Sequence, residues 1–359
     1  MDLGKRISLV IAGASLLAVL LANCTPAAAP APAAKTPSAS QGTTTTPAKI
    51  SGVITVYSGR TKALVGPLLD QVAKDIGVEV RVRYGDTAQL AAAILEEGNR
   101  TPADVFFAQD AGALGALSKA GMLAKLPEAT LNKVDKRFRP AKGEWVGVSG
   151  RARVVAYNTQ SLKESDLPES IWGFTDPKWK GRIGWPPTNA SFQAFVTAMR
   201  VTQGEDKARE WLNGIQANSP KKYANNTAAI QAVASGEVQV AFINHYYLFG
   251  QLKEKGDSFA ARNYYPRKGD VGALMNVAGA AVLSTAKDKK AAEAFVEYLL
   301  SSGAQRYFAE QTFEYPMVQG VPADPRVPPL SQIETPNIDL SNLDDLDGTL
   351  KLMRDVGIL

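Results

Sequence analysis

Two consecutive phenols, Tyr246 and Tyr247, follow an apolar run that leads into Asn244 and His245. The run, residues 238–243, is rich in valine, isoleucine and phenylalanine, which is typical of a buried strand. In α/β proteins, ligands bind just beyond the carboxyl ends of strands. Because neighbouring strand residues point to opposite faces, both phenols can face one site only if the strand has already ended in a turn. The simpler alternative is one ring in the core and the other on the surface.

Polar residues also precede two predicted helices. The segment 186–191 (Pro-Pro-Thr-Asn-Ala-Ser) comes before an apolar-periodic helix at 192–202, and 223–227 (Tyr-Ala-Asn-Asn-Thr) comes before one at 228–235. Side chains of these types are typical of helix starts. The free N–H groups of a helix start bind anions with help from the helix dipole. The two segments therefore predict an anion site in the same part of the chain as the tyrosine pair.

The chain between residues 50 and 120 alternates strands with helices. This alternation predicts a largely parallel sheet. Four polar side chains fall at the carboxyl ends of its strands, where a ligand would lie: Tyr57, Arg60, Gln109 and Asp110. The predicted strands are 52–57, 78–83 and 103–107, and the helices are 62–76, 88–97 and a third that ends at 120.

Two long β stretches connect this part with a second α/β part. We predict that residues 145–157 lead out of the first part and that 266–282 lead back, with a helix at 287–311 after the return. This pattern predicts an α/β fold of two lobes joined by a two-strand hinge, with a cleft that closes on a small solute. Lobe 1 would comprise residues 51–150 and 276–359, and lobe 2 residues 151–275.

The N-terminus indicates the compartment. Lys5 and Arg6 precede an apolar run, 7–22, that is too short for a typical membrane-spanning helix. It ends at Cys24, the only cysteine, in a pattern that resembles a bacterial lipobox, although a core cysteine after a chance apolar run is the alternative. We therefore expect a signal peptide at 1–23, acylation of Cys24 and attachment to the outer face of a membrane. Residues 24–50 contain mainly alanine, proline, serine and threonine and should form a linker.

Composition argues against several other classes of protein. The net charge is +5, with 45% hydrophobic and 21% charged residues, which is an ordinary globular composition. The sequence shows no clustered basic face with interleaved aromatic residues, which argues against nucleic-acid binding. The sequence has neither a Walker-type phosphate loop nor a paired-carboxylate motif, so it gives no motif that would indicate an enzyme. Nucleophilic catalysis would need serine or cysteine beside a base, but the cysteine lies in the lipobox and the single histidine has no evident partner.

Four short motifs occur along the chain: 101–106 (Thr-Pro-Ala-Asp-Val-Phe), 149–155 (Ser-Gly-Arg-Ala-Arg-Val-Val), 179–184 (Trp-Lys-Gly-Arg-Ile-Gly) and 243–247 (Ile-Asn-His-Tyr-Tyr). Together they resemble the periplasmic ferric-ion-binding proteins, also called bacterial transferrins. The resemblance extends over residues 52–359. It implies a type II periplasmic-binding-protein fold and a monomeric binding protein of an ABC transporter, located in the cell envelope, that delivers Fe³⁺ to a permease in the cytoplasmic membrane.

The resemblance implies that Tyr246 and Tyr247 supply phenolate oxygens to Fe³⁺, a hard cation that favours anionic oxygen donors. The family's histidine and glutamate ligands are replaced here by Thr61 and Gln109. The rest of the metal site is therefore open. Anion oxygens could complete the metal site, with Gln109 as a further candidate residue at the metal. Alternatively, further phenolates could complete it. The candidates for further phenolates are Tyr57 and Tyr157, for both of which packing is an equal alternative.

The resemblance also implies a synergistic anion, carbonate or phosphate, at the helix start after residues 182–185. Arginine suits planar, bidentate anions. The expected donors are Asn189, Ala190, Ser191, Asn226 and Asn244, with Arg60 and Arg153 to neutralise the anion.

Three further residues near these motifs are not expected to bind metal. Strand alternation should turn His245 away from Tyr246, and Asp104 lies in a motif that should organise a turn. Asp110 is likewise left out of the expected site. Two alternatives to iron remain: an organic cargo such as thiamine, a polyamine or a phosphonate in the same fold, or a tyrosine pair that forms a protein-contact surface on an adhesive lipoprotein.

Overall fold

The structure, a computed structural model, describes residues 52–359. The predicted signal peptide, the acylation site Cys24 and the linker lie outside the described residues. Within the described part, no helix has both the length and the apolar character needed to cross a membrane.

The first lobe is built on parallel strands, as the alternation of elements predicts. β1 (Val53–Ser58) lies between β2 (Glu79–Tyr84) and β3 (Val105–Ala108) and pairs in parallel with both. The crossover helices are α1 (Lys62–Ile76) and α2 (Thr87–Glu97), and α3 (Ala111–Lys119) follows β3. All four residues of β3 are buried, which explains why its sequence is continuously apolar.

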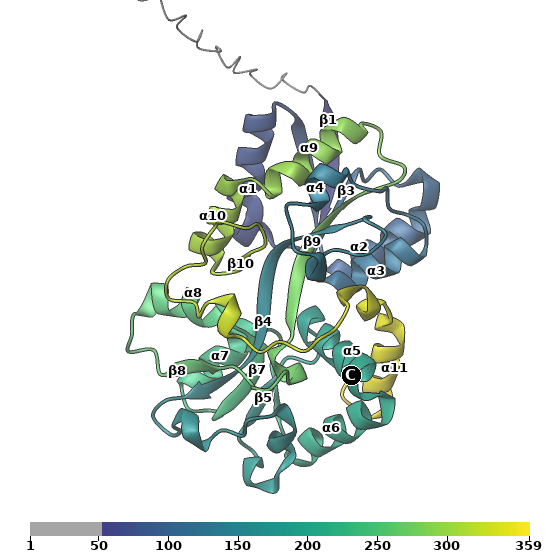
Figure 1. The fold of residues 1–359 in the computed structure, drawn as a ribbon. Helices are drawn as coiled ribbons and strands as arrows, with labels where there is room; N and C mark the ends of the chain where they lie inside the picture. Colours follow the sequence, from purple (N-terminus) through teal and green to yellow (C-terminus); the bar gives the residue numbers. More distant parts are fainter. Residues whose placement is uncertain (1–51) are drawn as a thin grey trace, which may run out of the picture. The chain divides into compact units, whose positions relative to one another are not determined.

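Two long antiparallel strands join the lobes (Figure 1). β4 (Val146–Asn158) pairs with β9 (Met275–Val282) through its first half and with β7 (Val240–Asn244) and β8 (Ala261–Tyr264) through its second half. β9 also pairs with β3, so one sheet continues through both lobes in the order β2-β1-β3-β9-β4-β7-β5-β6. The predicted two-lobed α/β fold with a two-strand hinge is confirmed.

The second lobe adds two short strands and four helices. β5 (Ile183–Trp185) pairs in parallel with β6 (Lys221–Lys222) and with β7. Its helices are α5 (Ala190–Gln203), α6 (Glu205–Ala217), α7 (Asn226–Ala234) and α8 (Tyr246–Lys255). A chain of edge-on and tilted aromatic rings fills its core, formed by Trp185, Phe192, Phe195, Trp211, Phe242 and Phe174.

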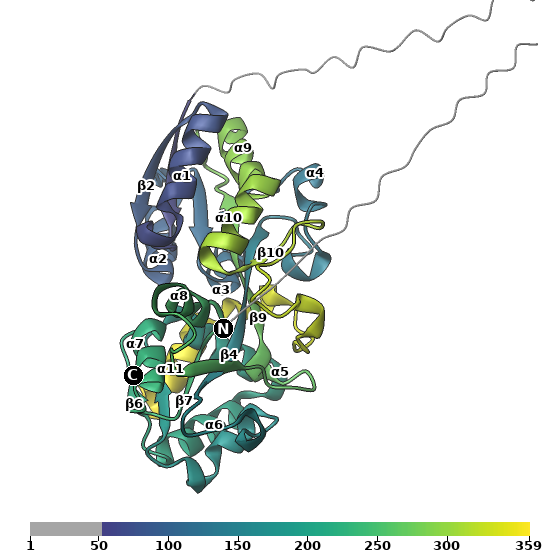
Figure 2. The ribbon, with the colours of Figure 1, turned by 90° about the vertical axis from the view of Figure 1, so that its left-hand side faces the viewer.

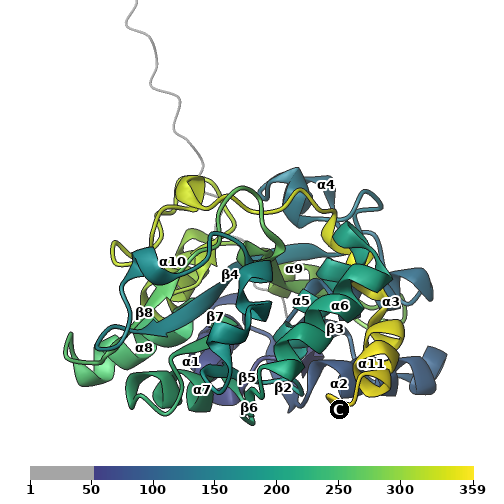
Figure 3. The same cartoon turned by 90° about the horizontal axis from the view of Figure 1, so that it is seen from below.

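The C-terminal part of the chain contacts both lobes. α9 (Lys289–Leu299) and α10 (Ser302–Thr312) pack against α1, as Figure 2 shows, and β10 (Tyr315–Pro316) pairs with β4. The 3₁₀ helix η8 (Leu340–Asp344) then lies against both α3 and α5. α11 (Leu346–Asp355) packs on α5 of the second lobe (Figure 3), although residues 276–359 were predicted to belong to the first. The pattern of one helix shows its apolar face but not its partner, so this docking could not be predicted.

Two predicted elements are shorter than expected. The stretch 266–282 is a strand only from Met275, because Pro266 has no N–H group to donate and both Lys268 and Gly269 adopt positive φ. The predicted helix 287–311 is two helices, because the Ser301 side chain accepts a hydrogen bond from the N–H of Ala304 and caps a new helix.

Two glycines face each other where β4 and β9 run side by side. Gly147 is the register partner of Gly279. A Cβ atom on Gly147 would lie 2.8 Å from the carbonyl oxygen of Phe138, and one on Gly279 would lie 3.0 Å from that of Val146. Backbone atoms cannot rotate out of the way as side chains do. The hinge strands therefore need glycine at this crossing.

We predict that Gly147→Ala destabilises the chain by about 1–3 kcal/mol because the added methyl overpacks the hinge. Gly250→Ala is the matched control, since Gly250 lies inside α8 and its Cβ would meet nothing within 4 Å. The control should be stabilising by about 0.5–1 kcal/mol, the usual difference between alanine and glycine in a helix. Urea unfolding of both variants without iron measures the two effects. Equal stability of Gly147→Ala and the unsubstituted chain would contradict the prediction.

Candidate functional site

The tyrosine pair lies at the point where a strand changes into a helix. β7 ends at Asn244, His245 already has helical backbone angles, and α8 begins at Tyr246. The strand alternation has therefore stopped before the tyrosines, as a shared site requires. The two rings stack with centroids 4.3 Å apart and planes 27° apart. Both phenols thus lie together at the first turn of α8.

Burial keeps the proton on the first phenol. Tyr246 is 7% exposed, and this burial, together with the neighbouring Tyr247, raises the pKa of Tyr246 well above its ordinary range. Arg60 and Arg151 act in the opposite direction. Tyr246 is therefore a neutral phenol at neutral pH. A cation beside it would favour loss of this proton.

His245 supports the backbone and has no free lone pair for a metal. Its Nδ1 accepts a hydrogen bond of 3.1 Å from the N–H of Ala152, and its Nε2 donates one of 2.8 Å to the carbonyl oxygen of Phe313. The ring is fully buried, and burial lowers the pKa of His245 to about 3. This arrangement agrees with the expected structural role of the only histidine.

Three guanidinium groups are buried near the tyrosines. Arg60 follows β1, and Arg151 and Arg153 lie two residues apart on β4, so these two share one face with Ser149. The exposed fraction of each arginine is 1–2%. Arg60 and Arg153 were predicted as anion partners, whereas Arg151 was not. The alternation of Ser149, Arg151 and Arg153 along the strand is the signal that could have identified it.

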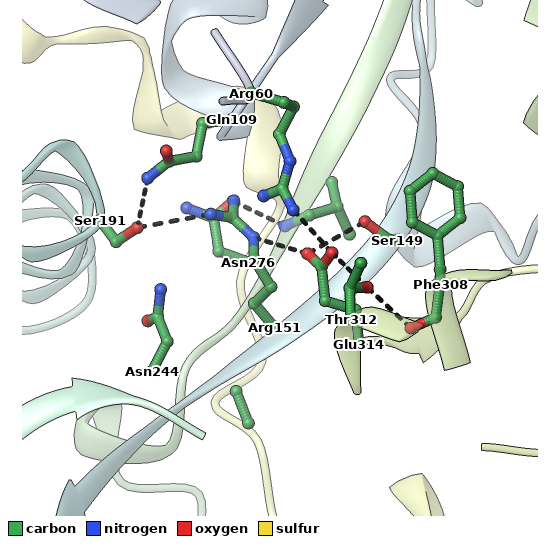
Figure 4. A network of polar contacts seen from close by, with 12 residues as sticks. Arg60, Gln109, Ser149, Arg151, Ser191, Asn244, Asn276, Phe308, Thr312 and Glu314 are labelled. Atoms are coloured by element: carbon green, nitrogen blue, oxygen red, sulfur yellow. Dashed lines mark hydrogen bonds and ion pairs between the residues drawn. The ribbon is translucent and has the colours of Figure 1, made fainter. Parts of the chain in front are cut away.

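One buried carboxylate, Glu314, lies beside two of these arginines, Arg60 and Arg151 (Figure 4). Its Oε2 accepts a hydrogen bond of 2.6 Å from Nη2 of Arg60 and one of 2.9 Å from the Thr312 hydroxyl. Its Oε1 accepts one of 3.2 Å from the Ser149 hydroxyl, and Nε of Arg151 lies 3.8 Å away. The sequence contained no signal for Glu314, because it lies 254 residues from Arg60 in the chain.

Several buried donors at this place have no hydrogen-bond partner among residues 52–359. An unsatisfied buried donor costs about 1–3 kcal/mol, so a cluster of them indicates a missing acceptor. Burial also lowers the pKa of Arg151 and lowers that of Arg153 to about 9, which shows how little anionic charge the protein itself supplies. The donors are Nε of Arg60, Nε and Nη2 of Arg151, Nη2 of Arg153 and Nδ2 of Asn244.

The predicted anion donors of the second lobe lie beside the arginines. Asn189 caps α5, whose first residue is Ala190, and its Oδ1 accepts from the N–H of Ser191 and from Nδ2 of Asn226. The Ser191 hydroxyl contacts Nη1 of Arg151 at 3.4 Å and accepts a 3.0 Å hydrogen bond from Nε2 of Gln109 (Figure 4). This last bond joins the two lobes and places Gln109 next to the anion donors.

Asn244 and Arg153 complete this arrangement from the end of β7. Nη1 of Arg153 donates a 3.0 Å hydrogen bond to Oδ1 of Asn244, its register partner across β4 and β7. The amide nitrogen of Asn244 is thereby turned away from Arg153 and left open. Asn244 therefore adds an unpartnered amide N–H to the unpartnered donors of the arginines.

The other two candidate phenols are not brought to the pair. The hydroxyl of Tyr57 donates to Glu97 at 3.0 Å and accepts from Arg83 at 2.9 Å, at the far end of α2. Tyr157 is paired with Val240 at the opposite end of β7, about 13 Å along the strand from Asn244 at 3.3 Å per residue. The resemblance suggested both residues, but the side-chain contacts of Tyr57 and the strand position of Tyr157 place them elsewhere.

The acidic residues left out of the expected site have identifiable surroundings. The carboxylate of Asp104 accepts from the N–H groups of Thr55 and Lys287 and organises a turn. Asp110 is buried, and this raises its pKa to about 6 despite Arg151 nearby. Across residues 52–359, no three His, Cys, Asp or Glu side chains cluster in a way that could hold a metal. A metal at this site would depend on phenols and on oxygen atoms from outside the chain.

Comparisons with known proteins agree with this geometry. Residues 100–342 match the family model of bacterial extracellular solute-binding proteins. The chain is 37% identical over 308 residues to the major ferric iron-binding protein of Neisseria meningitidis serogroup A, covering 85% of this chain and 93% of that protein.

Two solved structures are also similar. Iron-bound HitA from Pseudomonas aeruginosa superposes with a TM-score of 0.81 at 38% identity, covering 85% of this chain and 99% of that one. A Trichodesmium protein (IdiA, FutA) in complex with iron and citrate ligands gives 0.75 at 31% identity, with 86% and 100% covered. Both similarities extend over nearly all of the described residues.

We predict that the imidazole of His245 does not titrate between pH 8 and pH 5. Protonation would need a second donor at Nδ1, which already faces the N–H of Ala152, and burial holds the pKa at about 3. Proton NMR should therefore show one histidine Hε1 signal whose chemical shift stays constant over this range. A shift with a midpoint near the ordinary value of 6.5 would contradict the assignment.

Proposed function

Because this chain belongs to the bacterial extracellular solute-binding proteins, and among them to the ferric-ion-binding proteins, we propose that it captures Fe³⁺ together with an anion and delivers it to an ABC permease. The permease lies in the cytoplasmic membrane, and an acylated Cys24 holds the protein at the outer face of that membrane. The protein acts as a monomer and catalyses no reaction. Its task is reversible binding.

The stacked phenol pair beside three buried guanidinium groups is the observation that carries this proposal. Fe³⁺ is small and highly charged and prefers anionic oxygen ligands. Two adjacent phenolates meet this preference without histidine or cysteine. An organic cation such as a polyamine would be repelled by the arginines, so the site suits a metal accompanied by an anion.

The ligands are divided between the chain and the anion. Tyr246 and Tyr247 bind the iron as phenolates. Thr61 and Gln109, which stand where the family has histidine and glutamate, supply no anionic oxygen, and Tyr57 and Tyr157 are held elsewhere by their own contacts. The anion, carbonate or phosphate, therefore supplies the remaining oxygen ligands.

The anion is bound by donors that the chain itself leaves open. Arg151 and Arg153 present unpartnered N–H groups from β4, and Arg60 presents one from the loop after β1. Ser191 and Asn244 add a hydroxyl and an amide, and Asn226 and Ala190 complete the helix starts around them. Loading thus matches positive charge on the protein with negative charge on the anion.

We predict a visible phenolate-to-iron charge-transfer band when the chain is titrated with ferric citrate in bicarbonate. Tyr246→Phe and Tyr247→Phe should each weaken iron binding by at least tenfold, because each removes an anionic ligand worth more than about 1.4 kcal/mol. Tyr57→Phe and Tyr157→Phe are matched controls and should leave the band unchanged. A chain that gives no band with any anion would contradict iron binding and favour an organic cargo.

We predict that iron binding releases protons and weakens in acid. The raised pKa of Tyr246 means that this phenol carries its proton at neutral pH and must lose it to bind iron. In a pH-stat titration, Tyr246→Phe should therefore release about one proton fewer per iron than the unsubstituted chain. Equal proton release would show that the Tyr246 phenol does not bind the metal as an anion.

A further inference from the structure

We propose that Glu314 is a built-in counter-ion that determines how much negative charge the co-bound anion must carry. This inference rests on the proposed binding of iron with an anion. It assigns a specificity-determining role to a residue that binds neither the iron nor the anion but holds the arginines that do.

Glu314 is held from three sides. Its carboxylate joins Arg60 in the loop after β1, Ser149 on the hinge strand β4, and Thr312 at the end of α10. Its side chain is fully buried. A carboxylate without access to water persists only when charged and hydrogen-bonding groups replace its hydration. Glu314 is therefore placed as the counter-ion of Arg60.

The backbone beside Glu314 is tied to the tyrosine pair. Phe313 adopts a left-handed conformation with φ of 57°, and its carbonyl oxygen accepts the hydrogen bond from Nε2 of His245. His245 directly precedes Tyr246. Arg326 also covers the Phe313 ring, with its guanidinium carbon 4.6 Å from the ring centroid. These contacts fix the distance between the carboxylate and the place where the iron would bind.

The buried charges do not balance without a ligand. Arg60, Arg151 and Arg153 contribute three positive charges. Glu314 and, at pH 8, Asp110 contribute two negative charges, so an excess of one positive charge remains. Fe³⁺ bound to two phenolates adds one more. Neutralising Glu314 would raise the excess further and so favour a more highly charged anion. Asp110 lies near Arg151 but is unchanged in every variant below, so its contribution cancels.

The alternative is a purely structural role. If Glu314 only fastened Arg60 to the hinge, its loss would weaken the binding of all anions alike. A charge effect instead changes one anion relative to another. The ratio of affinities for two anions of different charge therefore separates the two roles.

The experiment compares bicarbonate with inorganic phosphate at pH 8. Iron is supplied as its nitrilotriacetate complex to the whole chain, and the charge-transfer band reports the iron affinity in each anion. In Glu314→Gln the phosphate-to-bicarbonate affinity ratio should rise on the order of tenfold, because one unit charge changes near the anion. Glu314→Asp keeps the charge and should keep the ratio of the unsubstituted chain.

Ser149→Ala is the neutral control, since it removes a hydrogen bond to the same carboxylate without a change of charge. The phosphate-to-bicarbonate affinity ratio of Ser149→Ala should equal that of the unsubstituted chain. If Glu314→Gln does not fold, as thermal unfolding would show, Glu314→Ala removes the same charge without a buried amide and should raise the ratio in the same way. A folded Glu314→Gln or Glu314→Ala with an unchanged ratio would overturn the inference. Absence of the band in the unsubstituted chain would instead contradict the proposed function.

Discussion

Burial of three arginines close to the carboxylate of Glu314 is the constraint on which the site depends. Guanidinium groups lose their hydration when they are buried, and only Arg60 forms a hydrogen-bonded ion pair with Glu314. All three arginines keep at least one buried donor without a partner among the described residues. A folded chain that keeps such groups inside is prepared for a ligand, because its own contacts leave them incomplete. The tyrosine pair has the opposite requirement. Burial raises the pKa of Tyr246, so a nearby cation would be needed to ionise this phenol.

The buried arginines and the tyrosine pair lie together at the hinge. Arg151 and Arg153 lie on β4, the tyrosines lie at the end of β7, which pairs with β4, and Arg60 approaches from the first lobe through Glu314. Arg60 and the second-lobe side chains therefore belong to different lobes. His245 connects the second lobe to the Phe313 carbonyl next to Glu314. The geometry of the site thus depends on the relative position of the two lobes.

The sequence predicted what local patterns encode. The helix start at Asn189 and the hinge strand β4 follow from neighbouring residues, and the structure contains both. For the tyrosines the sequence predicted only a condition, a turn at the strand end, and the structure begins a helix there. Glu314 could not be predicted, because only the tertiary fold brings it to Arg60. Tyr57 and Tyr157 lie in predicted strands, but the direction of a side chain beyond its strand depends on packing partners such as Glu97. The long predicted helix after residue 287 was divided by a single capping serine.

The 3₁₀ helix η8 gives the molecule a third connection between its lobes. Its Leu340 and Leu343 are fully buried, and Gly112 of α3 lets the backbone of Leu343 approach closely. The chain then continues into α11, which Arg200 holds on the second lobe through Asp345. Separation of η8 from α3 would expose these leucines, at roughly 1.5–3 kcal/mol for each side chain. The position of the lobes in this structure therefore has a source of stability that is independent of any bound ligand.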